Sequence, residues 1–372
     1  MSASWQVIAA PAPPAGAGAD WEWTWVYEGL SRIRHDREQQ TWGYTDRWAP
    51  TPVAMAFLTD SPYRRTVLRV AVREHDGAPT ADDVLGVARV TFPLDGDAHV
   101  GFVDVDVDPH CEGQGIGTAL ADVAEKLLDQ EARTTTLTWT VHAPEPEPGP
   151  GVVTAPTGSG RVDLADPRAR FATSRGFRLE QVARASTLTV QHIAPAEVER
   201  LRVDAAAHAG PDYRVHTWNR TVPEQYHAAL AALWGRMSTD APTGAVDIPD
   251  EEWDADRVAG RLDDLARAYQ QCLLAAAEHV PSGTLAAFTL LSVPEPDVEF
   301  GFQEDTLVLP EHRGRRLGML VKATNLQQLA ALRANVRRLH TVNAEENAFM
   351  LAINVALGYR GAGVIATWQK QA

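Results

Sequence analysis

Residues 102–120, FVDVDVDPHCEGQGIGTAL, decide the fold of this chain. Valine and aspartate alternate up to Asp108, which is the period-two pattern of a half-buried β-strand, and Pro109 ends it. Three glycines follow, and then an Ala/Leu-rich run that predicts a helix. Glycines before a helix let backbone N–H groups converge on one point, where the helix dipole adds partial positive charge. The stretch therefore predicts a strand–loop–helix unit that binds an anion, of which phosphate is the usual one.

The same construction occurs a second time, about one domain length further along the chain. Residues 306–319, TLVLPEHRGRRLGM, repeat the strand end, the glycine loop and the start of a long helix. A loop found twice at one offset is more specific than one found once, although a glycine turn that only packs a helix against a strand remains an alternative. The repeat predicts two halves of like fold, residues 1–195 and 196–372.

The rest of the pattern predicts a mixed α/β protein whose two halves follow the same order of elements. We expect strands at 67–74, 84–94, 102–108, 135–142, 177–184, 187–192, 283–293, 298–309, 339–342 and 364–369, and tight turns at 95–97 and 294–297. We expect helices at 19–37, 119–130, 166–175, 224–238, 251–278, 317–333 and 345–356. The Pro/Gly-rich residues 143–167 predict a long exposed loop, and 193–203 a linker with a short helical piece.

Composition excludes several classes of protein. The two cysteines, Cys111 and Cys272, fall in different halves, which excludes a disulfide scaffold and leaves too few ligands for a cysteine metal site. The net charge of −15 opposes binding to nucleic acid and to anionic membranes. No apolar run is long enough to span a bilayer, and residues 1–20 lack the basic region of a signal peptide. We therefore expect a cytoplasmic protein without a metal site.

Both loops carry the residues of one known pattern. Residues 112–117 are Glu-Gly-Gln-Gly-Ile-Gly and residues 313–318 are Arg-Gly-Arg-Arg-Leu-Gly, each preceded by Val-x-Pro. This pattern resembles the GNAT superfamily of acetyltransferases. Residues 347–359, NAFMLAINVALGY, resemble a later signature of that family, of which only the tail remains in the first half, at 171–177, FATSRGF. The two halves together resemble the tandem GNAT proteins, a group that includes mycothiol synthase.

The resemblance implies two domains, each a mostly antiparallel twisted sheet flanked by helices. It also implies transfer of an acetyl group from acetyl-CoA to an amine of a small molecule. The acetyl-CoA contacts carried over to the first half are Val107, Gly113, Gln114, Gly115, Ile116, Gly117 and Thr118. Those carried over to the second half are Leu307, Val308, Arg313, Gly314, Arg315, Arg316, Leu317, Gly318 and Asn347.

Direct acetyl transfer needs a general base, because an amine is nucleophilic only without its extra proton. The family often places a carboxylate on the strand before the loop, where the second half has Glu304 and Asp305. The acidic tyrosine of the family is replaced by Asn354, which can hydrogen-bond to the thioester sulfur but cannot protonate it. We favour the second half as catalytic, since its loop begins with Arg313 where the first loop has Glu112.

Two other functions stay open at the level of sequence. Neither half has the tyrosine acid, so the chain could bind acyl-CoA as a regulatory pseudoenzyme without turnover. It could also acetylate a protein or peptide amine, which would need a long open groove where a small molecule needs a closed pocket. The sequence does not specify the acceptor or the oligomeric state.

Overall fold

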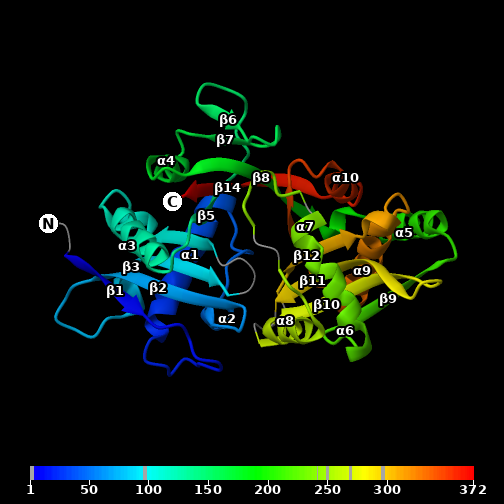
Figure 1. Ribbon diagram of the computed structural model, residues 1–372, viewed down its shortest axis with the longest axis horizontal. Coiled ribbons are helices and arrows are strands. Elements are labelled where there is room, and N and C mark those ends of the chain that lie inside the picture. The colour runs from blue at the N-terminus through cyan, green and yellow to red at the C-terminus, as the bar shows by residue number, and fades with distance from the viewer. Residues whose placement is uncertain (1–3, 95–98, 241, 249–250, 268–269, 295–297) are drawn as a thin grey trace.

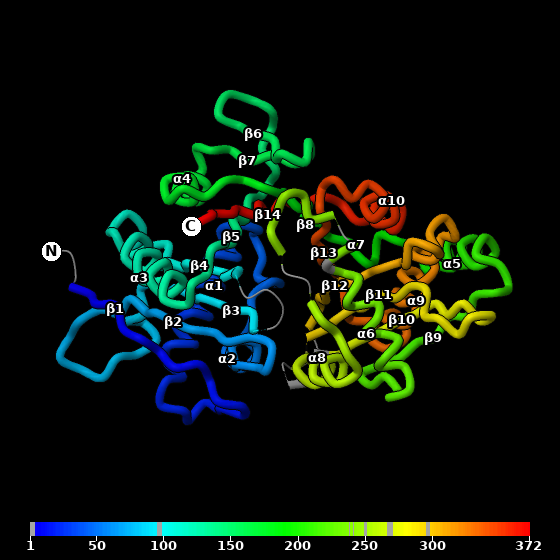
Figure 2. Tube along the Cα trace, viewed as in Figure 1, coloured from blue at the N-terminus to red at the C-terminus, as the bar shows by residue number. Residues whose placement is uncertain are grey.

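The computed structural model describes residues 4–94, 99–240, 242–248, 251–267, 270–294 and 298–372. The described residues form one continuous sheet of 12 strands with helices on both faces, and a separate two-stranded hairpin (Figures 1 and 2). The turn predicted at 95–97 and the centre of the one predicted at 294–297 lie outside the described residues. Mixed α/β architecture, with a mostly antiparallel sheet, is confirmed.

The elements of the first half run from β1 to β8. They are β1 Trp5–Ala10, α1 Thr24–Trp42, α2 Thr51–Leu58, β2 Arg64–Arg73, β3 Val84–Pro93, β4 Val100–Val107, α3 Ile116–Gln130, β5 Thr135–His142, β6 Val152–Thr154, β7 Arg161–Asp163, α4 Pro167–Ser174 and β8 Arg178–Thr189. Those of the second half are α5 Pro195–Ala209, β9 Tyr213–Asn219, α6 His227–Gly235, α7 Met237–Asp240, α8 Ala255–Arg267, β10 Gln270–His279, β11 Thr284–Pro294, β12 Phe300–Val308, α9 Leu317–Leu332, β13 Arg338–Ala344, α10 Ala348–Ala356 and β14 Arg360–Gln371.

The two halves exchange their last strands. The sheet order is β1-β2-β3-β4-β5-β14-β8-β13-β12-β11-β10-β9. The final strand of the chain, β14, therefore pairs with β5 of the first half, while β8 pairs with β13 of the second half. β14 and β8 also pair with each other at the centre of the sheet, where the red and green strands meet in Figure 1. The predicted domain boundary between residues 195 and 196 stays a prediction, because each half contributes a strand to the sheet of the other.

In both halves the two parallel strands pair only at their first residues. β4 and β5 pair over Val100–Phe102, and β12 and β13 pair over Phe300–Phe302. Beyond these residues the strands diverge, and each glycine loop stands at the diverging end. In the second half the register between β11 and β12 shifts at residues 304–305, whereas β3 and β4 pair without a shift. Such an irregularity redirects side chains and is frequent beside active sites.

Alternation along the strands places helices on both faces of the sheet. In β2, Leu68 and Val70 pack with α1 and α2, while Ala71 packs with α3 on the opposite face. β10 does the same in the second half, with Leu274 against α6 and α8 and Leu273 on the other face against α9. None of the described helices is both long enough and apolar enough to cross a membrane.

Four sequence predictions are corrected. The helix predicted at 251–278 is α8 followed by strand β10, whose residues 272–277 are buried on both faces of the sheet, so tertiary packing outweighs the helix propensity of alanine and leucine. Residues 143–167 contain the hairpin β6–β7, which buries Val162. The two strands predicted at 177–184 and 187–192 are largely one strand, β8. The predicted linker at 193–203 lies mostly within helix α5.

Candidate active site

The first loop has the backbone expected of an anion site. Gly113 and Gly115 have φ angles of +74° and +82°, which side chains other than glycine rarely adopt. Gly115 is also the N-cap of α3, and no side chain caps the helix there. A Cβ atom on Gly117 would lie 3.4 Å from Val107 Cγ2, so this glycine keeps the helix close to the strand. The first N–H groups of α3 are therefore left for an external acceptor.

A cavity of about 600 Å³ opens between the diverging strands β4 and β5 at this loop. Predicted acetyl-CoA contacts that line it are Val107, Gly113, Gly115, Ile116, Gly117 and Thr118. Gln114 is exposed on the loop and does not line the cavity. Helix α1 adds a wall that the sequence analysis did not identify, formed by Arg37, Glu38, Thr41 and Trp42. These four residues are spaced so that they lie on one face of a helix, and this spacing is the sequence signal that could have identified the wall.

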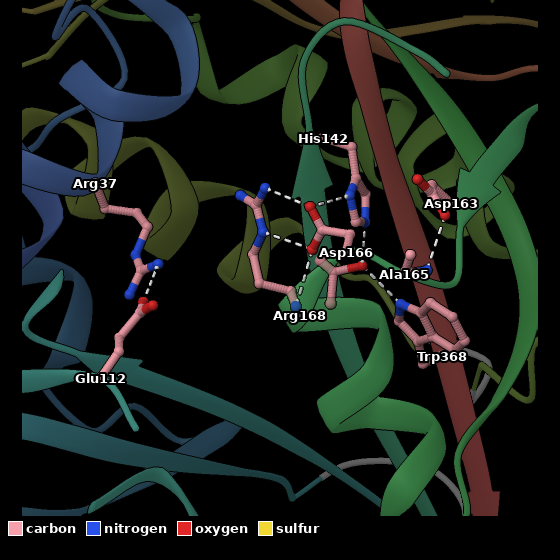
Figure 3. A network of polar contacts seen from close by, with 9 residues as sticks. Arg37, Glu112, His142, Asp163, Ala165, Asp166, Arg168 and Trp368 are labelled. Carbon is pink, nitrogen blue, oxygen red and sulfur yellow. Dashed lines mark hydrogen bonds and ion pairs between the residues drawn. The ribbon is translucent and has the colours of Figure 1, made fainter. Parts of the chain in front are cut away.

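Arg37 neutralises the acidic residue of the first loop. Its Nη1 donates to Glu112 Oε1 at 2.8 Å, and its Nη2 donates to the Val107 carbonyl oxygen at 2.7 Å (Figure 3). Glu112 occupies the position where the family pattern has a basic residue, so a carboxylate beside a bound phosphate would be unfavourable on its own. The ion pair with Arg37 of α1 removes this repulsion without adding net positive charge.

Arg168 lines the same cavity from α4. Figure 3 shows it across from Arg37, held by Asp166, which is the N-cap of α4. Arg168 Nε and Nη2 donate to the two Asp166 oxygens at 3.1 and 3.0 Å. Burial alone would raise the pKa of Asp166, but hydrogen bonds from His142 and Arg168 outweigh it and hold the pKa well below its usual range. The carboxylate therefore stays charged and keeps Arg168 at the cavity wall.

The aspartates of β4 are held in ion pairs with arginines. Asp106 is paired with Arg34 at 2.8 Å, and Asp108 with Arg32 at 2.6 Å. Asp104 pairs with a third arginine, on β3. These contacts join α1 and β3 to β4 and its C-terminal end. The three aspartates therefore have a structural role.

The second loop has a similar backbone with a different charge. Gly314 has a φ angle of +78°, and Arg316 takes the left-handed conformation at +55° where the first loop has glycine. Arg316 is the N-cap of α9 and gives it no side-chain cap, as in the first half. Arg313 Nη2 lies 3.6 Å from Asp240 of α7, and its Nε donates to the Val308 carbonyl oxygen at 3.3 Å. Arg315 is exposed beside it.

Several predicted contacts of the second half have local structural roles. Asn347 caps α10 by accepting a hydrogen bond from the Met350 backbone N–H at 3.2 Å. Leu307 and Leu317 are buried in the core. A Cβ atom on Gly318 would lie 3.0 Å from Ile353 Cδ1, so α10 packs closely on this helix start. Contact of these residues with acetyl-CoA stays a prediction.

The two predicted carboxylates lie where the register of β12 shifts. Ser292 Oγ donates to Glu304 Oε1 at 2.6 Å, and Trp234 Nε1 donates to Asp305 Oδ2 at 2.8 Å. Burial raises the pKa of Glu304; the Ser292 hydrogen bond opposes this in part, and the neighbouring Asp305 adds to it. Asp305 lines a larger cavity of about 1,240 Å³ between the two halves, which Arg64 and Tyr63 line from the first half. Asp305 therefore faces a space that both halves build.

Two comparisons relate this chain to known proteins. Residues 21–147 match the model of the acetyltransferase (GNAT) family. A tandem GNAT protein from the clavulanic acid biosynthesis pathway is 21% identical and shares the fold, with a TM-score of 0.72 over 99% of this chain and 98% of that one. Residues 21–147 thus match a GNAT acetyltransferase domain, and the whole chain shares the fold of a tandem GNAT protein.

Other solved structures share parts of this fold. A GCN5-related glucosamine N-acetyltransferase region of a fungal multi-domain GH3 β-N-acetylglucosaminidase is 14% identical, with a TM-score of 0.61 over 100% of this chain and 38% of that one. A GCN5-related N-acetyltransferase from Sphaerobacter thermophilus is 15% identical, with a TM-score of 0.55 over 99% and 95% of the two chains. No curated protein matches this chain in sequence.

The two halves differ in the side chains that stand beside their glycine loops. Ala121, Ala172 and Phe177 line the first cavity. The matching positions of the second half, by the offset of the two loops and by the later signature, hold Lys322, Asn354 and Tyr359. All three side chains are buried, and Asn354 Nδ2 donates to Asn343 Oδ1 at 2.6 Å while its own Oδ1 has no partner. The second half therefore carries larger buried side chains at these three positions.

Proposed function

We propose that this protein transfers an acetyl group from acetyl-CoA to an amine of a small molecule, and that acetyl-CoA binds in the first half. The observation that carries the proposal is the cavity between β4 and β5, which ends at the uncapped N-terminus of α3. Backbone N–H groups and the helix dipole suit a pyrophosphate there. Arg37 and Arg168 also line this cavity, and each is held in an ion pair with a carboxylate.

The size of the cavity at the first loop suits a bound small molecule such as acetyl-CoA. Ligand pockets commonly measure about 300–1,000 Å³, and the cleft at the first loop falls in this range at about 600 Å³. The larger cavity between the halves is separated from it by two stacked rings, Phe102 and Trp139, with centroids 5.5 Å apart. Acceptor and acetyl-CoA would thus occupy adjoining spaces on the two sides of this aromatic pair.

The chemistry is direct transfer. The amine nitrogen attacks the thioester carbonyl carbon, a carbon–nitrogen bond forms and the carbon–sulfur bond breaks. A carboxylate accepts the proton that the nitrogen loses, and the departing thiolate takes a proton to become the thiol of CoA. A base with a raised pKa suits the first proton transfer, because a carboxyl group with its ordinary pKa accepts protons poorly near neutral pH.

Catalysis in the second half is the second candidate, and it is the one favoured on sequence. Glu304 supports it, since its raised pKa and its place in the register shift of β12 are features of active-site carboxylates. Asp305 supports it as well, because it opens onto the cavity between the halves. The larger buried side chains Lys322, Asn354 and Tyr359 beside the second loop favour the first half as the stronger acetyl-CoA site.

We expect Thr118→Asp to weaken acetyl-CoA binding by about ten- to a hundredfold. Thr118 is exposed in the first turn of α3 and lines the cavity, so a carboxylate there repels the pyrophosphate by on the order of 1–3 kcal/mol. The same carboxylate is favourable to the helix dipole, so the fold is retained. Isothermal titration of the full chain with acetyl-CoA measures the change.

Thr118→Asn is the matched control, because it has the shape of the aspartate without the charge. It should bind acetyl-CoA within about threefold of the native protein. Equal affinities for Thr118→Asp and Thr118→Asn would remove the first loop from the proposal. Binding without turnover toward any of a panel of primary amines would favour the pseudoenzyme alternative.

The double variant Arg313→Ala/Arg315→Ala tests the second loop in the same titration. We expect the native chain to show a second, weaker binding step, and the double variant to lose that step while the first is unchanged. Two cations at the start of a helix oppose its dipole and so favour a bound anion. An unchanged second step would exclude the second loop as its site.

A further inference from the structure

Glu38 lies on the wall of the first cavity, in helix α1. Its side chain is half-buried, and its Oε2 atom is closed off from solvent without a hydrogen-bond partner. A buried carboxylate oxygen without a hydrogen-bond partner destabilises the folded protein, so its presence calls for a functional explanation. The glycine loop lines the same cavity, so Glu38 and the predicted acetyl-CoA contacts share one space.

The other carboxylates of this cavity are held in ion pairs. Asp106 is paired with Arg34, Glu112 with Arg37, and Glu125 with Arg175 at 2.8 Å. A carboxylate in such a pair is a poor proton acceptor, because the cation stabilises its charged form. Glu38 differs from these three, since it lines the cavity without an ion pair among the described residues.

The surroundings of Glu38 adjust its basicity. Burial raises the pKa of Glu38 to about 7, and the positive charge of Arg47 opposes the shift only in part. Trp42 from α1 and the backbone at Arg47 also favour the charged form, while Asp46 disfavours it. Arg37, the other charged group of α1 on this wall, forms an ion pair with Glu112. A carboxyl group with a pKa near neutral is suited to accept protons at physiological pH.

We propose that Glu38 is the general base of the first half, where it accepts the proton of the amine that attacks the thioester. The proposal rests on the function proposed above, since it needs acetyl-CoA in the same cavity. The amine loses one proton as its bond to the acetyl carbon forms, and the Glu38 carboxylate receives it. The proton then leaves to solvent or to the departing thiolate, which restores the carboxylate for the next turnover.

The first test follows the carboxyl group itself. In the full-length protein with ¹³C-labelled glutamate carboxyls, one signal should titrate near pH 7, disappear in Glu38→Gln, and shift when acetyl-CoA is added. Arg47→Met should move its midpoint to higher pH, because a neighbouring positive charge is lost. A signal assigned to Glu38 that titrates in the ordinary range of about 4–5, or that ignores acetyl-CoA, would overturn the proposal.

The second test measures turnover with water as the acceptor, as thiol release from saturating acetyl-CoA. The native rate should fall below about pH 7. Glu38→Gln should lower the rate by at least about a hundredfold, as expected when a general base is removed. Glu38→Asp should restore part of the rate. Equal rates for native protein and Glu38→Gln would overturn the proposal. Where hydrolysis is below detection, the carboxyl titration decides.

The two proposals fail in different ways. Glu38→Gln should leave the acetyl-CoA affinity unchanged within about twofold, whereas Thr118→Asp should lower it. If Thr118→Asp has no effect, acetyl-CoA does not bind at the first loop and the proposed function of this half fails. If affinity responds at Thr118 while rate and titration ignore Glu38, the binding site stands and the base lies elsewhere, with Glu304 as the next candidate.

Discussion

Ala366→Pro is expected to destabilise both halves together, by more than about 4 kcal/mol. Ala366 is fully buried in β14, where it stands opposite Thr140 of β5 and Val182 of β8. A proline there removes a backbone donor, and its ring meets a strand on either side. Because β14 closes the sheet of the first half, a change near the C-terminus should remove structure around β5.

Hydrogen exchange in the full-length protein measures this coupling. Peptides covering β5 and β8 should lose protection in Ala366→Pro together with those covering β14. The control is Gln6→Pro in β1, an edge strand that pairs on one side only, where the loss should stay local and much smaller. Retained protection of β5 in Ala366→Pro would show that the first half does not depend on the exchanged strand.

The strand–loop–helix units could be predicted closely because their signals are local. Most of strand β4, the left-handed glycines and the start of α3 fall within the stretch 102–120. The second unit follows the same rules over 306–319. Turn chemistry and helix starts depend on residues near in sequence, so a single chain carries them in full.

Elements defined by distant partners could not be predicted in this way. The strand β10 was assigned to a helix because CLLAAA has high helix propensity, and only its place between β9 and β11 makes it a strand. The exchange of β8 and β14 leaves no trace in the pattern of either strand. Sheet pairing depends on what lies beside a strand in space, which hydrophobic periodicity does not report.

The same reasoning applies to the site. Arg37 and Glu112 are 75 residues apart in sequence, so the cation that compensates the acidic loop could not be found from the loop alone. The raised pKa of Glu38 comes from its burial, which is not visible in a helix of mixed composition. The loop residues were predicted from a repeated motif, while the α1 wall became apparent only with the cavity.

Lys322→Met is expected to stabilise the protein by about 4 kcal/mol at pH 7. Lys322 lies in α9 with only 1% of its surface exposed, and burial lowers its pKa from 10.5 to about 7. Its Nζ lies 5.8 Å from the centre of the Tyr359 ring, and no ion pair with it is found among the described residues. A pKa that falls from 10.5 to about 7 corresponds to a loss of roughly 4 kcal/mol of stability at pH 7, and methionine of similar shape removes this loss.

The pH dependence gives the sign. Between about pH 7 and 10.5 the unfolded chain binds a proton at Lys322 that the folded protein does not, so the free energy of unfolding rises with pH in this window. Below about pH 7 both states are protonated and the penalty is constant. The buried tyrosines Tyr27 and Tyr359 have raised pKa values, so their opposite effect begins only near pH 10.

Urea unfolding between pH 7 and 9.5 separates these contributions. The difference in unfolding free energy between Lys322→Met and the native protein should be largest at pH 7 and shrink by about 3 kcal/mol at pH 9.5. Lys126→Met makes the same chemical change at an exposed position of α3, the equivalent helix, and should leave the difference near zero throughout. A Lys322→Met difference that does not vary with pH would mean that the lysine is charged in the folded state. The second cleft would then hold a buried cation, and its affinity for an anionic ligand would have to be reconsidered.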